Sequence, residues 1–171
     1  IAAKLETPYF SKSHIIDLLT PYCSSHPELI SSIWQDLLAI MDRDPAANQM
    51  IVPFLFFKGF HAIQTYRFSR LFWCNGRPGL AQFLQSRMSD IFDVDIHPGA
   101  QIGSGIFIDH GSGVVIGETA VIGHNVSILH DVTLGGTGKD CGDRHPKVGD
   151  WVLIGTGAKV LGNIVIGEGS K

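Results

Sequence analysis

The chain has 171 residues, a formal net charge of -3 at pH 7 and three cysteines. This length suffices for one substantial core or two smaller modules. The slightly negative charge and the lack of a basic run argue against a nucleic-acid partner and against binding to an anionic membrane. The longest apolar run, Met50 to Phe57, is interrupted by Pro53 and is too short to span a bilayer.

The three cysteines form no CxxC pair, so we expect a reducing compartment, cytoplasmic by default, rather than a disulfide framework. Because no basic stretch leads into an apolar segment near Ile1, we expect no signal peptide. The sequence opens on Ile1 and stops at Lys171 inside a repeat unit, without the capping element that a solenoid needs at its free end. We therefore expect it to be part of a longer chain.

Residues 1–92 contain only three of the twenty glycines, and their apolar residues recur with helical spacing. The pattern predicts four helices, which cover Ile15 to Tyr22, Pro27 to about Asp44, Phe54 to Phe72 and Leu80 to Phe92. We interpret residues 1–92 as an all-helical packing and oligomerisation domain. Asp44 is the exception, because it lies at a helix end where its carboxylate could reach a neighbouring site. An ordinary surface position is an equally good interpretation of this residue.

From residue 93 to residue 171 the chain repeats every six residues. An aliphatic residue opens each unit, glycine often follows it, and a small or branched residue comes four positions later. One large and one small inward side chain per six residues is typical of a β-helix of short parallel strands joined by tight turns. An α-helix would need a period of 3.6 residues and would not tolerate so much glycine. The aliphatic positions are Ile96, Ile102, Ile108, Ile116, Ile122, Ile128, Leu134, Val148, Ile154, Val160 and Ile166.

The repeat is broken at residues 109–113 and again at residues 135–147. A solenoid buries its core only while its register holds, so each break has to be extruded as a bulge or loop. Extrusions from a repeat scaffold commonly carry binding residues. Both breaks contain a histidine, His110 in the first and His145 in the second.

Asp95 and His110 are fifteen residues apart, close to the roughly eighteen-residue circumference of a three-strand coil. Stacked coils could therefore bring them near each other. A carboxylate beside an imidazole is the orienter-and-base pair of hydrolases and acyltransferases. A solvated His-Asp pair is the alternative. In the second break, Arg144 offers a planar fork for a carboxylate, with His145 beside it; a flexible polar loop is the alternative there.

Other kinds of site fit the sequence less well. The run Gly135 to Lys139 resembles a phosphate loop, but Thr133 stands where its first glycine should be and Asp140 where its Ser or Thr should be. No HExxH motif or Cys-His cluster accompanies the remaining histidines of the repeat, so we predict no metal site and interpret them as solvent-facing turn residues. These histidines are His97, His124 and His130.

Several stretches from about residue 25 to the end of the chain together resemble serine O-acetyltransferases, a family of the hexapeptide-repeat acyltransferase superfamily. Two departures stand out: Gly111-Ser112 replaces the family's more usual Ala-Thr, and Thr156 stands where alanine is common. The matching stretches are Asp44-Pro45-Ala46, Lys58-Gly59-Phe60-His61, Val94-Asp95-Ile96-His97-Pro98, Asp109-His110-Gly111-Ser112-Gly113, Gly117-Glu118-Thr119-Ala120-Val121, Val132 to Lys139 and Gly142-Asp143-Arg144-His145-Pro146-Lys147.

The resemblance implies an α+β chain, with a helical N-terminal domain (1–92) followed by a left-handed parallel β-helix (93–171) that extrudes the loop 135–147. It also implies homotrimers, commonly paired into hexamers, with active sites between adjacent β-helices. The implied reaction transfers acetyl from acetyl-CoA to L-serine in cysteine biosynthesis, with L-cysteine as a feedback inhibitor. O-acetylserine sulfhydrylase would bind a C-terminal tail that lies beyond Lys171.

Carried over by motif, the resemblance makes His110 the general base and Asp95 its orienting carboxylate. Asp44 and Asp109 would hold the serine ammonium group. Arg144 and His145 would contact the substrate, His145 from a neighbouring subunit. The backbone around Gly136, Thr156 and Gly157 would bind CoA. We expect direct transfer without a covalent intermediate, since no cysteine occupies a motif position.

Three other functions fit parts of the pattern. The first is an acetyltransferase that acts on a sugar or xenobiotic hydroxyl and keeps the base histidine. The others are a non-catalytic scaffold of the cysteine-synthesis complex and a zinc-dependent β-helix lyase.

Overall fold

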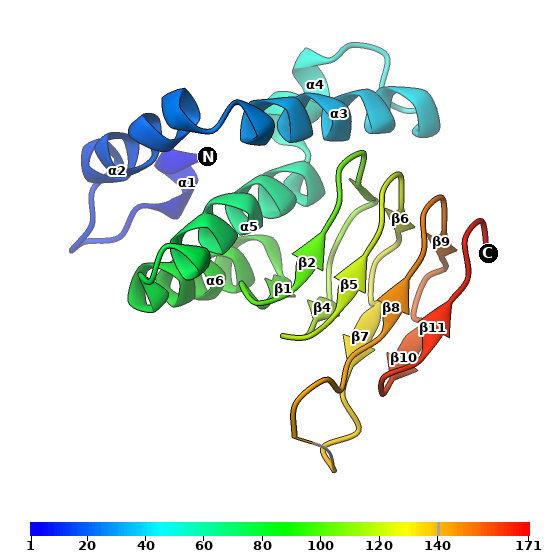
Figure 1. Cartoon of the computed structure of the whole chain (residues 1–171). Coiled ribbons are helices and arrows are strands. Elements are labelled where there is room, and N and C mark those ends of the chain that lie inside the picture. Colours follow the sequence, from blue (N-terminus) through cyan, green and yellow to red (C-terminus); the bar gives the residue numbers. More distant parts are fainter. Residues whose placement is uncertain (140) are drawn as a thin grey trace.

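The computed structural model describes residues 1–139 and 141–171, and in them six helices precede eleven short strands (Figure 1). Two of the helices, α3 and α5, are seventeen residues long. In none of the described residues is there a helix long and apolar enough to cross a membrane. The helices are α1 (Ala2–Leu5), α2 (Lys12–Ser25), α3 (Pro27–Arg43), α4 (Ile51–Phe56), α5 (Lys58–Cys74) and α6 (Pro78–Phe92).

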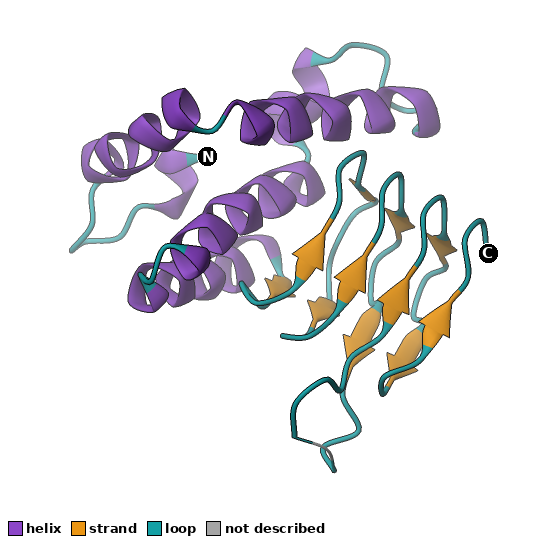
Figure 2. Ribbon diagram, viewed as in Figure 1, coloured by secondary structure: helices purple, strands orange, loops and turns teal. Residues whose placement is uncertain are grey.

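The strands stack into three parallel sheets that form the faces of a β-helix (Figure 2). The first sheet contains β1 (Val94–Ile96), β4 (Val114–Ile116), β7 (Thr133–Gly135) and β10 (Lys159–Leu161). The second contains β2 (Gln101–Ile102), β5 (Val121–Ile122), β8 (Lys147–Val148) and β11 (Val165–Ile166). The third contains β3 (Phe107–Ile108), β6 (Ser127–Ile128) and β9 (Leu153–Ile154).

Every aliphatic position of the six-residue repeat lies in a strand, and most of these side chains are buried. Equivalent residues stack on one another, for example Ile96 on Ile116 and Ile116 on Leu134. Most buried side chains of the coils pack with those of α2, α5 and α6 in one continuous core, whereas Leu37 and Ile40 of α3 lie in a second, smaller cluster. The predicted fold class, a helical region followed by a left-handed parallel β-helix, is confirmed.

The helical region differs from the prediction in one place that matters for function. The single helix predicted from Phe54 to Phe72 is two helices, because Phe57 adopts an extended backbone (φ -74°, ψ 115°) between α4 and α5. The break lets the beginning of α5 pack directly on the backbone at the end of β3. At Gly59 a Cβ atom would lie only 2.1 Å from the carbonyl oxygen of Ile108, so this approach requires glycine.

Candidate active site

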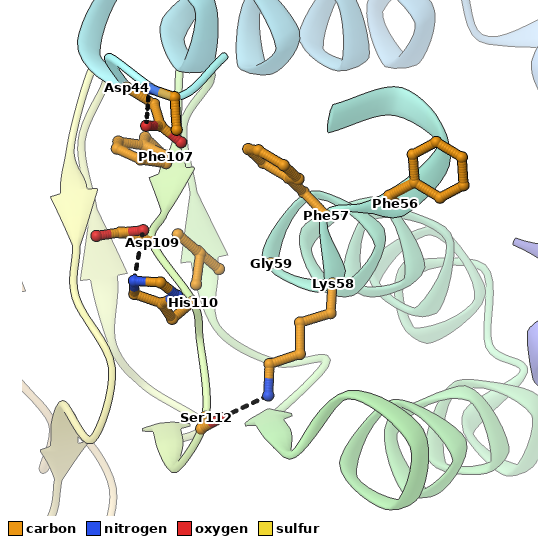
Figure 3. Close-up of a pocket in the computed structure, with 11 residues that line it drawn as sticks. Asp44, Phe56, Phe57, Lys58, Gly59, Phe107, Asp109, His110 and Ser112 are labelled. Carbon is orange, nitrogen blue, oxygen red and sulfur yellow. Dashed lines mark hydrogen bonds and ion pairs between the residues drawn. The ribbon is translucent and has the colours of Figure 1, made fainter. Parts of the chain in front are cut away.

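A cleft of about 550 Å³ lies where the end of α3 and the α4–α5 junction face the end of β3 (Figure 3). Three of the predicted site residues, Asp44, Asp109 and His110, line this cleft together. They come from two parts of the chain, since Asp44 caps α3 and the other two follow β3. The remaining lining residues are Ala46, Phe56, Phe57, Lys58, Gly59, Phe107, Ile108 and Ser112.

The first break of the repeat is a tight corner that presents His110 to solvent. His110 has φ 56°, and Gly111 and Gly113 also have positive φ values, so the chain turns sharply between β3 and β4. The His110 side chain is 74% exposed, and its Nε2 atom lies 3.7 Å from Oδ1 of Asp109. An imidazole held outward by a left-handed backbone, beside a carboxylate, can act as a general base.

Asp95 lies elsewhere in this chain. It is in the middle of β1, whose register aligns it with Val115 on β4, and its Oδ1 accepts a hydrogen bond from Gln85 Nε2 at 2.8 Å. Within the described residues, Asp95 makes no hydrogen bond or ion pair with His110. The proposed Asp95–His110 pair therefore stays a prediction, and Asp109 is the carboxylate that the structure places beside the imidazole.

His130 packs edge-on against His110 and was not among the predicted site residues. Because Ile108 pairs with Ile128 in the next coil, the residues two positions further on also stack, and the two imidazole centroids are 5.9 Å apart. Nδ1 of His130 is buried and has no hydrogen-bond partner in the described part of the chain. The offset of twenty residues between coils is the sequence signal that could have identified this contact.

Two of the residues predicted to bind the cofactor continue the same corner. Ile128 pairs with Ile154, so Thr156 follows His130 in the stack and is exposed. The backbone N–H of Gly157 donates to the carbonyl oxygen of His130 at 3.1 Å. The turns that follow β3, β6 and β9 are therefore stacked along one edge of the β-helix, from His110 to Thr156 and Gly157. An extended cofactor could lie along this edge.

Lys58 is a cation that lines the cleft. It belongs to one of the family motifs found in the sequence, but no role was predicted for it. It is the first residue of α5, and its Nζ atom donates to the hydroxyl of Ser112 on the His110 corner. It thus joins the helical region to the loop that carries the imidazole (Figure 3).

Arg144 and His145 lie at a different corner of the β-helix, the one that follows β4. The backbone N–H groups of both residues donate to the hydroxyl oxygen of Thr119, at 3.0 and 3.1 Å. Arg144 also forms an ion pair with Glu118, with Nη2 and Oε2 2.9 Å apart. Gly136, the third predicted cofactor residue, packs against Arg144 at the base of the 135–147 loop, where a Cβ atom would lie 3.3 Å from Arg144 Cγ.

The charges of this second group are fixed by their surroundings. Burial, followed by the positive charge of Arg144, lowers the pKa of His145, so its imidazole is neutral at pH 7. Nδ1 accepts a hydrogen bond from the Thr119 N–H at 3.2 Å, which leaves the proton on Nε2. The hydrogen bond from Arg144 lowers the pKa of Glu118. This corner therefore offers a guanidinium and a neutral N–H donor, a combination suited to a carboxylate.

The two groups of predicted residues are thus separate in one chain. Asp44, Asp109 and His110 line the cleft, whereas Arg144 and His145 are bonded to the corner after β4. Among the described residues, no three His, Cys, Asp or Glu side chains are grouped as metal ligands.

A family model described as "Serine acetyltransferase, N-terminal" matches residues 1–65. The "Probable serine acetyltransferase 4" of Oryza sativa subsp. japonica is 56% identical over 167 residues, which cover 97% of this chain and 53% of the relative. The serine acetyltransferase of Escherichia coli K12 is 50% identical over 171 residues, covering all of this chain and 63% of the relative. The chain thus spans about half to two thirds of the length of the curated relatives it matches.

The solved structures that are similar over 98% of this chain include two that contain a bound ligand. One is the soybean serine acetyltransferase complexed with serine, with a TM-score of 0.96 and 54% identity, of which 69% is covered. The other is the serine acetyltransferase of Brucella abortus strain S19 in complex with coenzyme A, with a TM-score of 0.95 and 50% identity, of which 67% is covered.

Proposed function

The chain belongs to the serine acetyltransferase family, and from this premise we propose that it transfers acetyl from acetyl-CoA to the hydroxyl of L-serine, giving O-acetyl-L-serine. One observation carries the proposal. The cleft combines an outward-facing imidazole with two aspartates, from α3 and from the end of β3. The similarity to one relative crystallised with serine and another with coenzyme A supports the choice of substrates.

His110 is the proposed general base. A serine hydroxyl is too weakly acidic to ionise near pH 7, whereas an imidazole, with an ordinary pKa of about 6.5, can take its proton during attack. The serine oxygen then bonds to the thioester carbonyl carbon, and the proton passes to the imidazole. When the tetrahedral oxyanion collapses, the carbon–sulfur bond breaks, and the CoA sulfur leaves with that proton. Asp109, and Asp95 as predicted from the family, are the carboxylates proposed to orient the imidazole.

The substrate ammonium group is proposed to lie between Asp44 and Asp109, because two carboxylates in one cleft suit a cation. Its carboxylate is proposed to bind Arg144 and His145 of a neighbouring subunit, since these residues lie at another corner of this chain. A trimer with active sites between adjacent β-helices would bring the two groups together. Exposed apolar side chains on the β-helix, including Leu153 and Leu161, support such contacts between subunits.

Acetyl-CoA is the proposed co-substrate, and the residues present fit it. Thr156 and Gly157 continue the edge that begins at His110, and their turn backbone is free of large side chains. Gly136 is proposed to contact the cofactor from the base of the 135–147 loop. The N–H of His130, or backbone N–H groups of the glycine-rich turns, would stabilise the oxyanion.

The remaining family properties are proposed for the whole protein. They are paired trimers, feedback inhibition by L-cysteine at the serine site, a cytoplasmic location and docking of a C-terminal tail into O-acetylserine sulfhydrylase. The apolar outer face of α3, formed by Ile30, Trp34 and Leu38, supports contact between trimers.

The test is the initial rate of CoA thiol release from acetyl-CoA by the full-length protein, with and without L-serine. Serine-dependent release that L-cysteine blocks would support the substrate, the reaction and the inhibitor together. Release with a sugar or amine acceptor, but none with serine, would move the function to another acetyltransferase of the same fold.

A further inference from the structure

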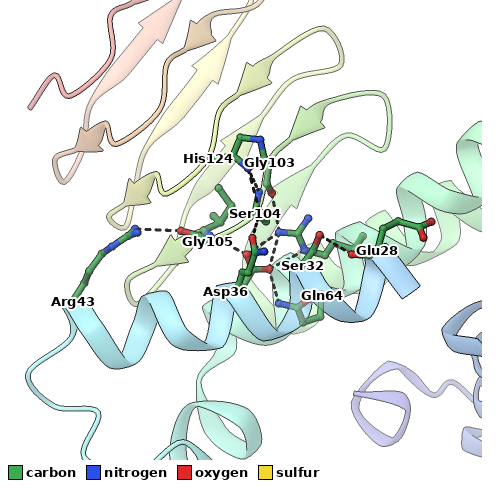
Figure 4. A network of polar contacts seen from close by, with 12 residues as sticks. Glu28, Ser32, Asp36, Arg43, Gln64, Gly103, Ser104, Gly105 and His124 are labelled. Carbon is green, nitrogen blue, oxygen red and sulfur yellow. Dashed lines mark hydrogen bonds and ion pairs between the residues drawn. The ribbon is translucent and has the colours of Figure 1, made fainter. Parts of the chain in front are cut away.

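The helix that carries Asp44 is attached to the β-helix through a buried polar network (Figure 4). The carboxylate of Asp36, in the middle of α3, is fully buried. It accepts two hydrogen bonds from Arg67 on α5, both at 2.8 Å, and one from the backbone N–H of Ile106 at 2.9 Å. Ile106 directly precedes β3, so this contact fixes the middle of α3 to the strand that leads to His110.

A second attachment lies at the end of the same helix. Arg43 is the last residue of α3, and its Nη1 atom donates to Gly105 O and to Ser127 Oγ, both at 3.2 Å. Its Nη2 atom donates to Asn125 Oδ1 at 3.3 Å. One guanidinium therefore bridges two successive coils of the β-helix. Two of these bonds are at the long end of the normal range and the third is slightly longer, so each adds little stability by itself.

Arg43 immediately precedes Asp44, the capping residue of α3. Helix ends fray, so the position of a capping residue depends on what holds the last turn. The Asp44 carboxylate accepts a hydrogen bond from the Ala46 N–H at 2.8 Å, which orients it within its own turn. That turn meets the β-helix through the buried side chain of Ala47, in a small apolar cluster with Phe107, and through Arg43.

We propose that Arg43 is a positioning residue for the substrate ammonium site, and that its bonds to both coils set the separation between Asp44 and Asp109. This inference rests on the proposed function, because it assumes that these two aspartates bind the ammonium group of L-serine. The direction of the change in the KM for L-serine distinguishes an effect of geometry from an effect of charge. Removing a nearby cation would by itself strengthen binding of an ammonium group, whereas loss of the correct Asp44 position weakens it.

The experiment compares Arg43→Met and Arg43→Lys with the wild-type full chain in the thiol-release assay. Misplacement of Asp44 raises the KM for L-serine about tenfold in Arg43→Met and leaves kcat and the KM for acetyl-CoA within about twofold. Arg43→Lys, which keeps the positive charge and the donors of a single nitrogen but not the planar fork, gives an intermediate KM. The control is Arg87→Met. Arg87 donates to the backbone carbonyls of Leu5 and Glu6 and lies on α6, which contributes no residue to the lining of the cleft. Its KM for serine stays at the wild-type value.

A double-mutant cycle with Asp44→Ala measures the coupling between Arg43 and Asp44. General destabilisation of the protein would not produce such a coupling. If Arg43 acts through Asp44, Arg43→Met adds less than a twofold change in the KM for serine once Asp44 is removed. Additive effects, an unchanged KM in Arg43→Met, or a lowered KM each overturn the inference while the proposed function stands. A wild-type chain that releases no thiol with serine overturns both. Ser127→Ala, which removes one acceptor, raises the KM in the same direction even where Arg43→Met folds poorly.

Discussion

His130 packs edge-on against His110, with ring centroids 5.9 Å apart and ring planes at 77°. An N–H group left unpaired in a buried position is more costly than an unpaired acceptor, and Nδ1 of His130 is buried without a partner among the described residues. The proton is therefore expected on Nε2. The proposed base then has an N–H donor beside it, and we propose that this donor stabilises the oxyanion formed from acetyl-CoA.

We predict that His130→Ala lowers kcat by about ten- to a hundredfold, within the range that loss of an oxyanion donor can cause. The KM for serine should change little, because His130 is not among the residues that line the cleft with Asp44 and Asp109. The His130→Gln variant keeps a side-chain N–H of similar reach and should recover most of the activity. Steady-state kinetics of both variants check this, and equal losses in the alanine and glutamine variants would remove the donor role.

His110→Ala should lower turnover by about a hundredfold or more, the scale of general-base catalysis. The fold should be retained, because the His110 side chain is exposed and its corner is held by backbone hydrogen bonds, including Gly113 N–H to Asp93 O at 2.8 Å. Circular dichroism of the variant checks folding, and thiol release checks activity. A variant with near-normal turnover would exclude His110 as the base.

Arg144→Ala should raise the KM for L-serine much more than the KM for acetyl-CoA, because the guanidinium is proposed to bind the amino-acid carboxylate. Glu118→Gln should cause a smaller change in the same direction, since Glu118 holds the guanidinium at 2.9 Å. Arg77→Ala, at an exposed arginine of the helical region, is the matched control. Equal rises in both KM values for Arg144→Ala would mean that Arg144 does not bind the carboxylate of L-serine.

The repeat made the β-helix predictable because each coil depends on local sequence. One aliphatic side chain per strand and a glycine turn after it specify the same geometry wherever they recur. Contacts between coils are less accessible to this reasoning, since they depend on the true length of a coil. Val94 pairs with Val114, twenty residues on, so Asp95 is aligned with Val115, and His110 with His130.

The helical region shows the same limit. Apolar spacing predicted helices in the regions of α2, α3 and α6. It also predicted one continuous helix across Phe57, because the residues on both sides of the break are apolar. The contact that accompanies the break, between Gly59 and Ile108, joins residues far apart in sequence, so apolar spacing could not show it. The separation of Arg144 and His145 from the cleft could likewise not be read from spacing, because the second repeat break hides how its loop folds back onto Thr119.

The contact of Gly59 with β3 leads to a prediction about stability. In Gly59→Ala the new Cβ would lie 2.1 Å from the Ile108 carbonyl oxygen, so α5 or the strand must move. We expect a loss of about 1–3 kcal/mol in the free energy of unfolding, as for overpacked cores. The control is Gly79→Ala on α6, where nothing lies within 4 Å and the better helix propensity of alanine should stabilise by up to about 1 kcal/mol. Chemical denaturation of both variants tests the contrast.

The pH dependence of stability should reflect His61, a buried histidine outside the cleft. Its Nε2 atom donates to Phe54 O at 2.8 Å, and its Nδ1 atom accepts from the Lys4 ammonium at 3.0 Å. Burial, with a smaller contribution from the charge of Lys4, lowers its pKa in the folded state. Protonation would place an N–H against the Lys4 ammonium, so the folded protein resists it.

Between the lowered pKa of folded His61 and about 6.5, the ordinary pKa of a histidine, the unfolded chain binds the extra proton and the folded chain does not. Stability therefore falls as the pH is lowered from about 6.5 through this window, and it is fully present above it. His61→Gln keeps a donor and an acceptor but cannot titrate, so its melting temperature should fall less steeply between about pH 7 and pH 5. His14→Gln, at an exposed histidine, is the matched control and should keep the wild-type slope. Identical slopes for wild type and His61→Gln would show that another group governs acid sensitivity.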